Sequence, residues 1–131
     1  MKQIIIDTSA IIAVILNEPE KDKLIEITQD TELISPASVH WEVGNAFSAM
    51  FKRKRLNLKE AIKGYSEYQK IPIQLIDIDI EDALKISDKN NIYAYDAYLI
   101  SCSIKFKLPL LTLDSHLHEI ALKNKVKILE V

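Results

Sequence analysis

The stretch IIIDTSAIIAVIL, residues 4–16, decides the fold. Its apolar start predicts a buried strand over residues 3–7, and residues 8–17 predict a helix capped by Thr8 or Ser9. Asp7 lies where the strand ends. A buried carboxylate without a partner is costly, so it shifts its pKa or is excluded. The sequence therefore predicts that Asp7 has partners elsewhere in the chain.

Short apolar runs alternate with longer helical patterns along the rest of the chain. Further strands are expected at 32–35, 73–78, 109–113 and 126–131, and further helices at 19–28, 37–55, 58–70, 79–89, 95–107 and 115–124. Such alternation predicts an α/β fold, a three-layer α/β/α sandwich with a central parallel sheet, in one domain over residues 1–131. Ligands of such sheets bind beyond the carboxyl ends of the strands.

Composition limits the possible functions. The 131 residues carry 17 Lys and Arg against 19 Asp and Glu, a net charge of −2, which argues against binding nucleic acid by bulk charge. A single cysteine excludes an intrachain disulfide and favours a reducing, cytoplasmic location. No segment approaches the roughly 18 apolar residues of a membrane span, so no membrane partner is expected. Two glycines are too few for a glycine-rich phosphate loop.

Three more acids stand in apolar surroundings. Asp114 follows the expected strand at 109–113, and Glu42 lies at the edge of the apolar face of the helix at 37–55. Asp96 is the only charge from Ala94 to Ile104, in the first turn of a helix expected to be buried on all sides. Carboxylate oxygens are the natural ligands of Mg²⁺ and Mn²⁺. The four acids therefore predict a shared divalent-cation site.

Each acid also has a structural alternative. Asp7 and Asp114 could each cap the helix that follows. Glu42 could be a solvated helix residue, because Glu is seldom buried. Asp96 could interact only with the dipole of its helix.

Other residues of these chemical types are interpreted as structural. Asp77 and Asp79 are typical of a strand end followed by a capped helix. His116 and His118 lack a nearby third ligand for zinc. Cys102 has no base beside it and is expected in the core.

With these residues in hand, the sequence resembles the PIN-domain ribonucleases, and in size the VapC-type toxins of toxin–antitoxin pairs. The matching stretches are IIIDTSAII, SVHWEVGNAF, AYDAYLISCSIKFKLPLLTLDSHL and VKIL. The resemblance implies a PIN-like fold and Mg²⁺-dependent, or Mn²⁺-dependent, hydrolysis of RNA that leaves 5′-phosphate and 3′-hydroxyl ends. The residues it implies are the catalytic, metal-binding acids Asp7, Glu42, Asp96 and Asp114, and the supporting hydroxyls of Ser9 and Thr112.

The same resemblance implies partners. A homodimer is expected, and a cognate antitoxin whose helix would bind a groove at residues 57–71. The basic run Lys52, Arg53, Lys54 and Arg55 either contacts RNA phosphates or is a solvated helix end.

Three alternatives differ in function. One is a catalytically silent PIN-like module that binds a protein partner, and another is an RNA-processing nuclease that is not a toxin. A phosphatase of the haloacid-dehalogenase type is the rival enzyme, but it needs a second Asp where this chain has Ser9.

Overall fold

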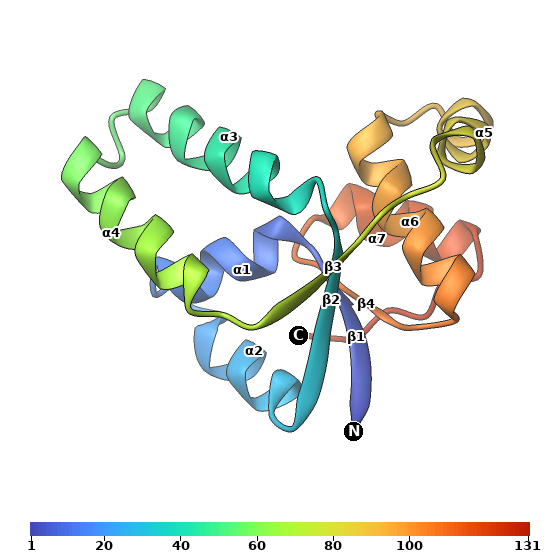
Figure 1. Cartoon of the computed structure of the whole chain (residues 1–131), viewed down its shortest axis with the longest axis horizontal. Helices are drawn as coiled ribbons and strands as arrows, with labels where there is room; N and C mark the ends of the chain where they lie inside the picture. The colour runs from blue at the N-terminus through green and yellow to red at the C-terminus, as the bar shows by residue number, and fades with distance from the viewer.

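Four parallel strands form one sheet in the order β3-β2-β1-β4 (Figure 1). The computed structural model describes all residues, 1–131. The strands are β1 (Lys2–Ile6), β2 (Thr31–Pro36), β3 (Ile73–Ile76) and β4 (Leu110–Leu111). The helices are α1 (Thr8–Ile15), α2 (Lys21–Thr28), α3 (Val39–Lys52), α4 (Leu58–Gln69), α5 (Ile80–Asn90), α6 (Ala94–Phe106) and α7 (Ser115–Lys123).

The strand β1 divides the core into two layers. Ile4 and Ile6 pack into one buried cluster with residues of α1, α2, α3 and α4. Ile5 packs into a second cluster with residues of α5, α6 and α7. Successive side chains of a strand point to opposite faces, so three consecutive isoleucines supply both cores. The predicted three-layer sandwich with a parallel central sheet is confirmed.

The hairpin of α3 and α4 forms one arm of the molecule (Figure 1). Asn57 begins α4 with a capping box, in which its side chain accepts from Glu60 N and Glu60 Oε1 accepts from Asn57 N. A Cβ at Gly64 would stand 2.8 Å from the Phe47 ring, so glycine allows the two helices to approach closely.

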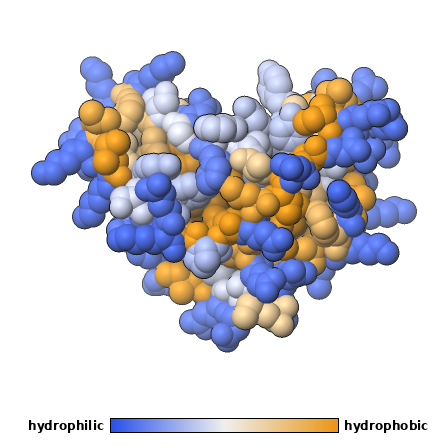
Figure 2. All heavy atoms as spheres, viewed as in Figure 1, coloured by the Kyte–Doolittle hydropathy of each residue, from blue (hydrophilic) through white to orange (hydrophobic).

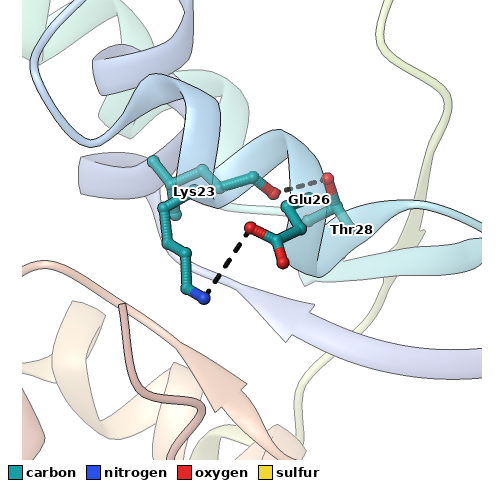
Figure 3. Close-up of polar contacts among 4 residues, drawn as sticks. Lys23, Glu26 and Thr28 are labelled. Carbon is teal, nitrogen blue, oxygen red and sulfur yellow. Dashed lines mark hydrogen bonds and ion pairs between the residues drawn. The ribbon is translucent and has the colours of Figure 1, made fainter.

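Hydroxyl groups close the end of α2 and join it to the sheet. Thr28 Oγ1 donates to Leu24 O at 2.8 Å (Figure 3). Thr31 Oγ1 donates to Thr28 O at 2.7 Å. The ion pair of Lys23 and Glu26 on the same helix is 3.7 Å long and exposed (Figure 3). Such an exposed pair contributes little to stability.

Two expectations about this framework are wrong. Residues 126–131 do not form a strand but only one parallel bridge, between Leu110 and Ile128, because β4 is two residues long and offers no further pairing. The helix α6 is not buried on all sides, since Tyr95, Ile104 and Phe106 are exposed. It packs against α5 and the sheet with one side and presents the other to solvent.

Smaller differences lie at helix ends. The helix expected over 37–55 begins at Val39 and ends at Lys52, and the one expected over 19–28 begins at Lys21. None of the helices combines the length and the apolar character that crossing a membrane requires.

Candidate active site

The carboxyl edge of the sheet lies between the α3–α4 arm and a second arm formed by α5 and α6 (Figure 1), and all four acids come from segments at this edge. Asp7 follows β1 and Asp114 follows β4, and these strands pair directly, with Ile6 opposite Leu111. The Asp7 N–H donates to Leu111 O at 3.0 Å, which fixes the two strand ends side by side. Glu42 and Asp96 lie in the first turns of α3 and α6.

Asp7 is the most enclosed of the four acids, with 7% of its surface exposed. Its Oδ2 accepts from Ser9 Oγ at 2.8 Å and from Thr112 Oγ1 at 2.7 Å. Burial raises the pKa of the Asp7 carboxyl, while the two hydroxyls and the Thr8 amide lower it. The charge of Asp114 also raises the pKa of Asp7, but more weakly than burial does. The Asp7 side chain is therefore held rigidly in a costly environment.

The capping expectations at α1 are wrong. Asp7, and not Thr8 or Ser9, occupies the N-cap position, and its side chain makes no capping hydrogen bond. The reason is that its Oδ2 is already engaged by the two hydroxyls.

Ser9 and Thr112 each hold two groups at once. Each donates its hydroxyl proton to Asp7, and each accepts a backbone N–H from the end of β4: Ser9 from Leu113 at 2.9 Å and Thr112 from Asp114 at 3.0 Å. Their oxygens lie 3.3 Å apart. The pair fixes the orientation of Asp7 and ties α1 to the β4 end.

Asp114 behaves differently. Its Oδ1 accepts from His116 N at 2.9 Å and from Leu117 N at 3.1 Å, so it caps α7. The capping alternative therefore holds for this acid. Its Oδ2 has no hydrogen-bond partner and is available to a ligand.

Glu42 and Asp96 are partly buried acids on opposite sides of the site. Burial raises the pKa of Glu42 to about 7, and the charges of Asp7 and Asp96 act in the same direction. Ser38 Oγ donates to Glu42 Oε2 at 2.9 Å and opposes that rise. Burial is also the largest cause of the raised pKa of Asp96, followed by Asp114 and Asp7, while His116 lowers it.

Each of the four acids therefore acts on, or is acted on by, the charge of another acid of the group. No group of three or more His, Cys, Asp or Glu side chains is close enough in this conformation to hold one metal ion. The donor chemistry nevertheless fits a hard divalent cation, because it consists of carboxylate oxygens. Thr8 Oγ1 adds a buried oxygen without a hydrogen-bond partner, on the same cavity as Glu42.

That cavity has a volume of about 410 Å³ and is lined by Thr8, Trp41, Glu42, Asn45, Ala46 and Tyr95. The surface is hollowed between the two arms at this end of the sheet (Figure 2). Trp41 and Tyr95 were not recognised from the sequence. The available signal was that each large aromatic residue immediately precedes an acid of the site.

The family model described as PIN domain matches residues 4–123. The chain belongs to the PIN domain family. Comparison with curated proteins finds no match. Family membership and fold together support a hydrolase of the nuclease class.

Three solved structures share this PIN fold. PAE2754 from Pyrobaculum aerophilum has a TM-score of 0.71 at 19% identity, over 97% of this chain and 83% of that one. VapBC2 from Rickettsia felis, bound to a DNA fragment from its promoter, has a TM-score of 0.66 at 12% identity, over 97% of both chains. VapC20 from Mycobacterium tuberculosis, a toxin that cleaves the sarcin-ricin loop, has a TM-score of 0.62 at 11% identity, over 88% of this chain and 93% of that one.

Residues interpreted as structural lie outside the acid site of this PIN domain, with one exception. Asp79 caps α5 by accepting from Asp82 N at 3.2 Å, as predicted. Cys102 is 1% exposed and burial raises its pKa to about 12, which confirms a core thiol. The exception is His116, whose charge acts on Asp96.

The basic run is remote from the acids. Lys52 ends α3, ten residues after Glu42. A helix rises 1.5 Å per residue, which separates the two by roughly 15 Å along the axis. Lys52, Arg53, Lys54 and Arg55 are all exposed at the far end of this arm. Phosphates that met them would belong to nucleotides away from the acids.

Proposed function

We propose that this PIN domain is a Mg²⁺-dependent endoribonuclease and the toxin component of a type II toxin–antitoxin pair. One observation carries the proposal: four acids from four separate elements lie at the carboxyl edge of the sheet, where burial and then the charges of neighbouring acids raise the pKa of Asp7, Glu42 and Asp96. Such clustering of like charges lowers the stability of the fold unless a cation occupies the site.

Asp7, Glu42, Asp96 and Asp114 would hold the ion. A bound Mg²⁺, with Mn²⁺ as an alternative, would supply Lewis acidity toward the phosphate and lower the pKa of bound water. Glu42 Oε2 accepts from the Ser38 hydroxyl, so Oε1 is the atom that would face the ion, and the bound cation would lower the pKa that burial raises to about 7. Asp7 is held by two hydroxyls, so its position would not change during the reaction. Cleavage is expected to leave 5′-phosphate and 3′-hydroxyl ends.

The toxin assignment rests on analogy. Two of the similar structures are a VapBC assembly and a toxin that cleaves RNA of the sarcin-ricin loop. The alternatives are an RNA-processing nuclease and a silent module that binds protein. A phosphatase finds less support, because Ser9, where a second Asp is needed, donates to Asp7.

A surface of suitable character supports an antitoxin partner. Leu58, Ile62 and Tyr65 form an exposed apolar stripe along α4. Beside it, Tyr65, Tyr68 and His40 line a cavity of about 410 Å³. We propose that an amphipathic helix of the antitoxin binds here, and that the chain forms a symmetric homodimer. A strict monomer at high concentration in solution scattering would contradict the dimer.

The decisive experiment measures cleavage of RNA with added Mg²⁺, Mn²⁺ or Zn²⁺ and with excess EDTA. Mg²⁺ or Mn²⁺ should support cleavage, EDTA should abolish it, and Zn²⁺ should not be the preferred ion because the site offers no thiolate ligand. Undiminished cleavage in EDTA would remove the proposal. A small phosphate ester as substrate tests the phosphatase, and an absence of any cleavage favours the silent module.

A further inference from the structure

Two exposed aromatic side chains flank the acids. Trp41 is 72% exposed on α3, and Tyr95 is 50% exposed on α6. Each precedes an acid of the site, Glu42 and Asp96, by one residue. Exposing large aromatic rings on both sides of a charged cleft costs solvation energy, and it is typical of a binding surface.

The same two rings line two cavities. One is the cavity described above, called the acid-lined cavity here, in which Glu42 is the single acid. Trp41 and Tyr95 also line a neighbouring space of about 440 Å³ whose walls are mostly apolar. Tyr98 and Ile80 form part of that wall. Tyr98 meets Tyr95 edge to face, with ring centroids 5.9 Å apart, which restrains the Tyr95 ring. One polar cavity and one apolar cavity therefore share a boundary made of two aromatic residues.

We propose that Trp41 and Tyr95 form a nucleobase subsite, in which an unpaired base of the RNA stacks while the neighbouring phosphate lies at the acids. The proposal rests on the proposed ribonuclease function and specifies its substrate as single-stranded or looped RNA. A base offers an aromatic face for stacking, and its own phosphate follows directly along the chain. The apolar cavity suits the base, and the acid-lined cavity suits the cation-bound phosphate.

Continuity of the two cavities favours RNA over a protein as the occupant. A second copy of the chain, or another protein, that covered Trp41 and Tyr95 would also close the mouth of the acid-lined cavity, since both residues line it. A nucleotide would fill the apolar space and leave the next phosphate in reach of Glu42 and Asp96. The subsite is thus compatible with substrate entry.

Trp41 is the only tryptophan of the chain, so its fluorescence reports on this subsite alone. The experiment mixes the full chain in Mg²⁺ with a single-stranded hexaribonucleotide, a matched abasic oligonucleotide or a blunt RNA duplex, and it records the fluorescence before cleavage proceeds. We expect quenching by the base-bearing single strand and little by the other two. Equal quenching by the abasic strand would show phosphate contact only and overturn the proposal.

Variants separate stacking from folding. Tyr95→Ala should weaken binding of the single strand roughly 5- to 100-fold, the range of one lost stacking contact, and Tyr95→Phe should restore it. Phe106→Ala, at an exposed aromatic residue at the far end of α6 outside both cavities, is the matched control and should bind as the parent does. In cleavage assays Tyr95→Ala should raise KM with kcat nearly unchanged. Parental affinity and KM in Tyr95→Ala would overturn the subsite.

Two further outcomes distinguish the rival occupant and the enzyme proposal. Fluorescence that changes with protein concentration in the absence of RNA would show that a second copy covers Trp41, against the proposal. Base-dependent quenching without any cleavage would support the subsite while contradicting the ribonuclease. Cleavage with no base-dependent quenching would support the ribonuclease and contradict the subsite.

Discussion

The ends of β1 and β4 present the same local sequence pattern, an acid between an apolar strand and a helix, yet the two acids have different environments. Asp114 is exposed and caps its helix. Asp7 is buried, makes no cap and binds two hydroxyls. The cause is position in the sheet, because β1 is a central strand and β4 is an edge strand of the four-stranded sheet. Burial, and not local sequence, separates a structural acid from a strained one.

The largest expected effect tests whether the buried acid, Asp7, is needed for RNA cleavage. If the proposed function holds, Asp7→Asn should lower RNA cleavage by at least ~100-fold, because the proposed site would lose one metal-binding carboxylate and several kcal/mol of charge stabilisation. Asp79→Asn is the matched control, since Asp79 also occupies the N-cap position between a strand and a helix. Single-turnover cleavage rates of both variants are the measurement. Equal losses in both would show that the effect comes from folding and not from the site.

The second prediction concerns stability without metal. Asp96→Asn removes a carboxyl group whose pKa is raised by burial and by the charges of Asp114 and Asp7. In EDTA the variant should be as stable as the parent or gain about 0.5–2 kcal/mol, the range of substitutions at strained functional sites. Mg²⁺ should then stabilise the parent more than the variant, since only an ion bound to the native state contributes. Thermal melts of both proteins in EDTA and in Mg²⁺ measure this.

A loss of stability in Asp96→Asn would indicate a structural role for this residue. If Asp96 served only the dipole of α6, Asn would lose about 0.3–1 kcal/mol with or without metal. A less stable variant with the parent's response to Mg²⁺ would therefore assign Asp96 to the fold.

Sequence patterns were sufficient for the framework and for placing the four acids at one edge of the sheet. The three isoleucines of β1 supply both cores, and acids at strand ends and first helical turns converge because parallel strands end at one edge. Ser9 and Thr112 were implied by family resemblance, and both bind Asp7.

What the sequence could not reveal depends on distant packing. The same apolar alternation that forms β1 fails at residues 126–131, because the neighbouring β4 is too short to pair with it. The environment of Asp7 depends on the hydroxyl of Ser9, two residues away, and on that of Thr112, 105 residues away in the chain, and no local rule contains the second. The facing positions of Trp41 and Tyr95 likewise arise only when α3 and α6 meet the same cavity.

The third prediction separates the two roles of Asp114. Asp114→Ala should destabilise the protein by about 1 kcal/mol, because an N-cap is lost. Asp114→Asn should remain close to the parent, since Asn caps equally well, yet it should lose cleavage if Oδ2 serves the ion. Urea unfolding gives the stabilities and RNA cleavage gives the activities. An active Asp114→Asn variant would confine this residue to the cap.

The smallest expected effect is a pH dependence of stability, which tests the raised pKa of Glu42. The pKa of Glu42 rises from an ordinary value of 4.5 to about 7 on folding, so the native state binds more protons than the unfolded chain between these values. Stability in EDTA should therefore fall as pH rises from about 4.5 to about 7, with Asp7 and Asp96 acting in the same direction from lower pH. For a partly exposed Glu42 the effect is on the order of 1 kcal/mol or less after solvent screening.

Two variants isolate this contribution. Glu42→Gln should flatten the fall, because its side chain cannot titrate, and parallel pH curves for parent and variant would contradict the assignment. Ser38→Ala should shift the fall to higher pH, because the Ser38 hydroxyl donates to Glu42 Oε2 and favours the charged form. Saturating Mg²⁺ should abolish or reverse the fall in the parent, since a bound cation stabilises the carboxylates that burial disfavours. Urea midpoints between pH 4 and pH 8, with EDTA and with Mg²⁺, provide the comparison.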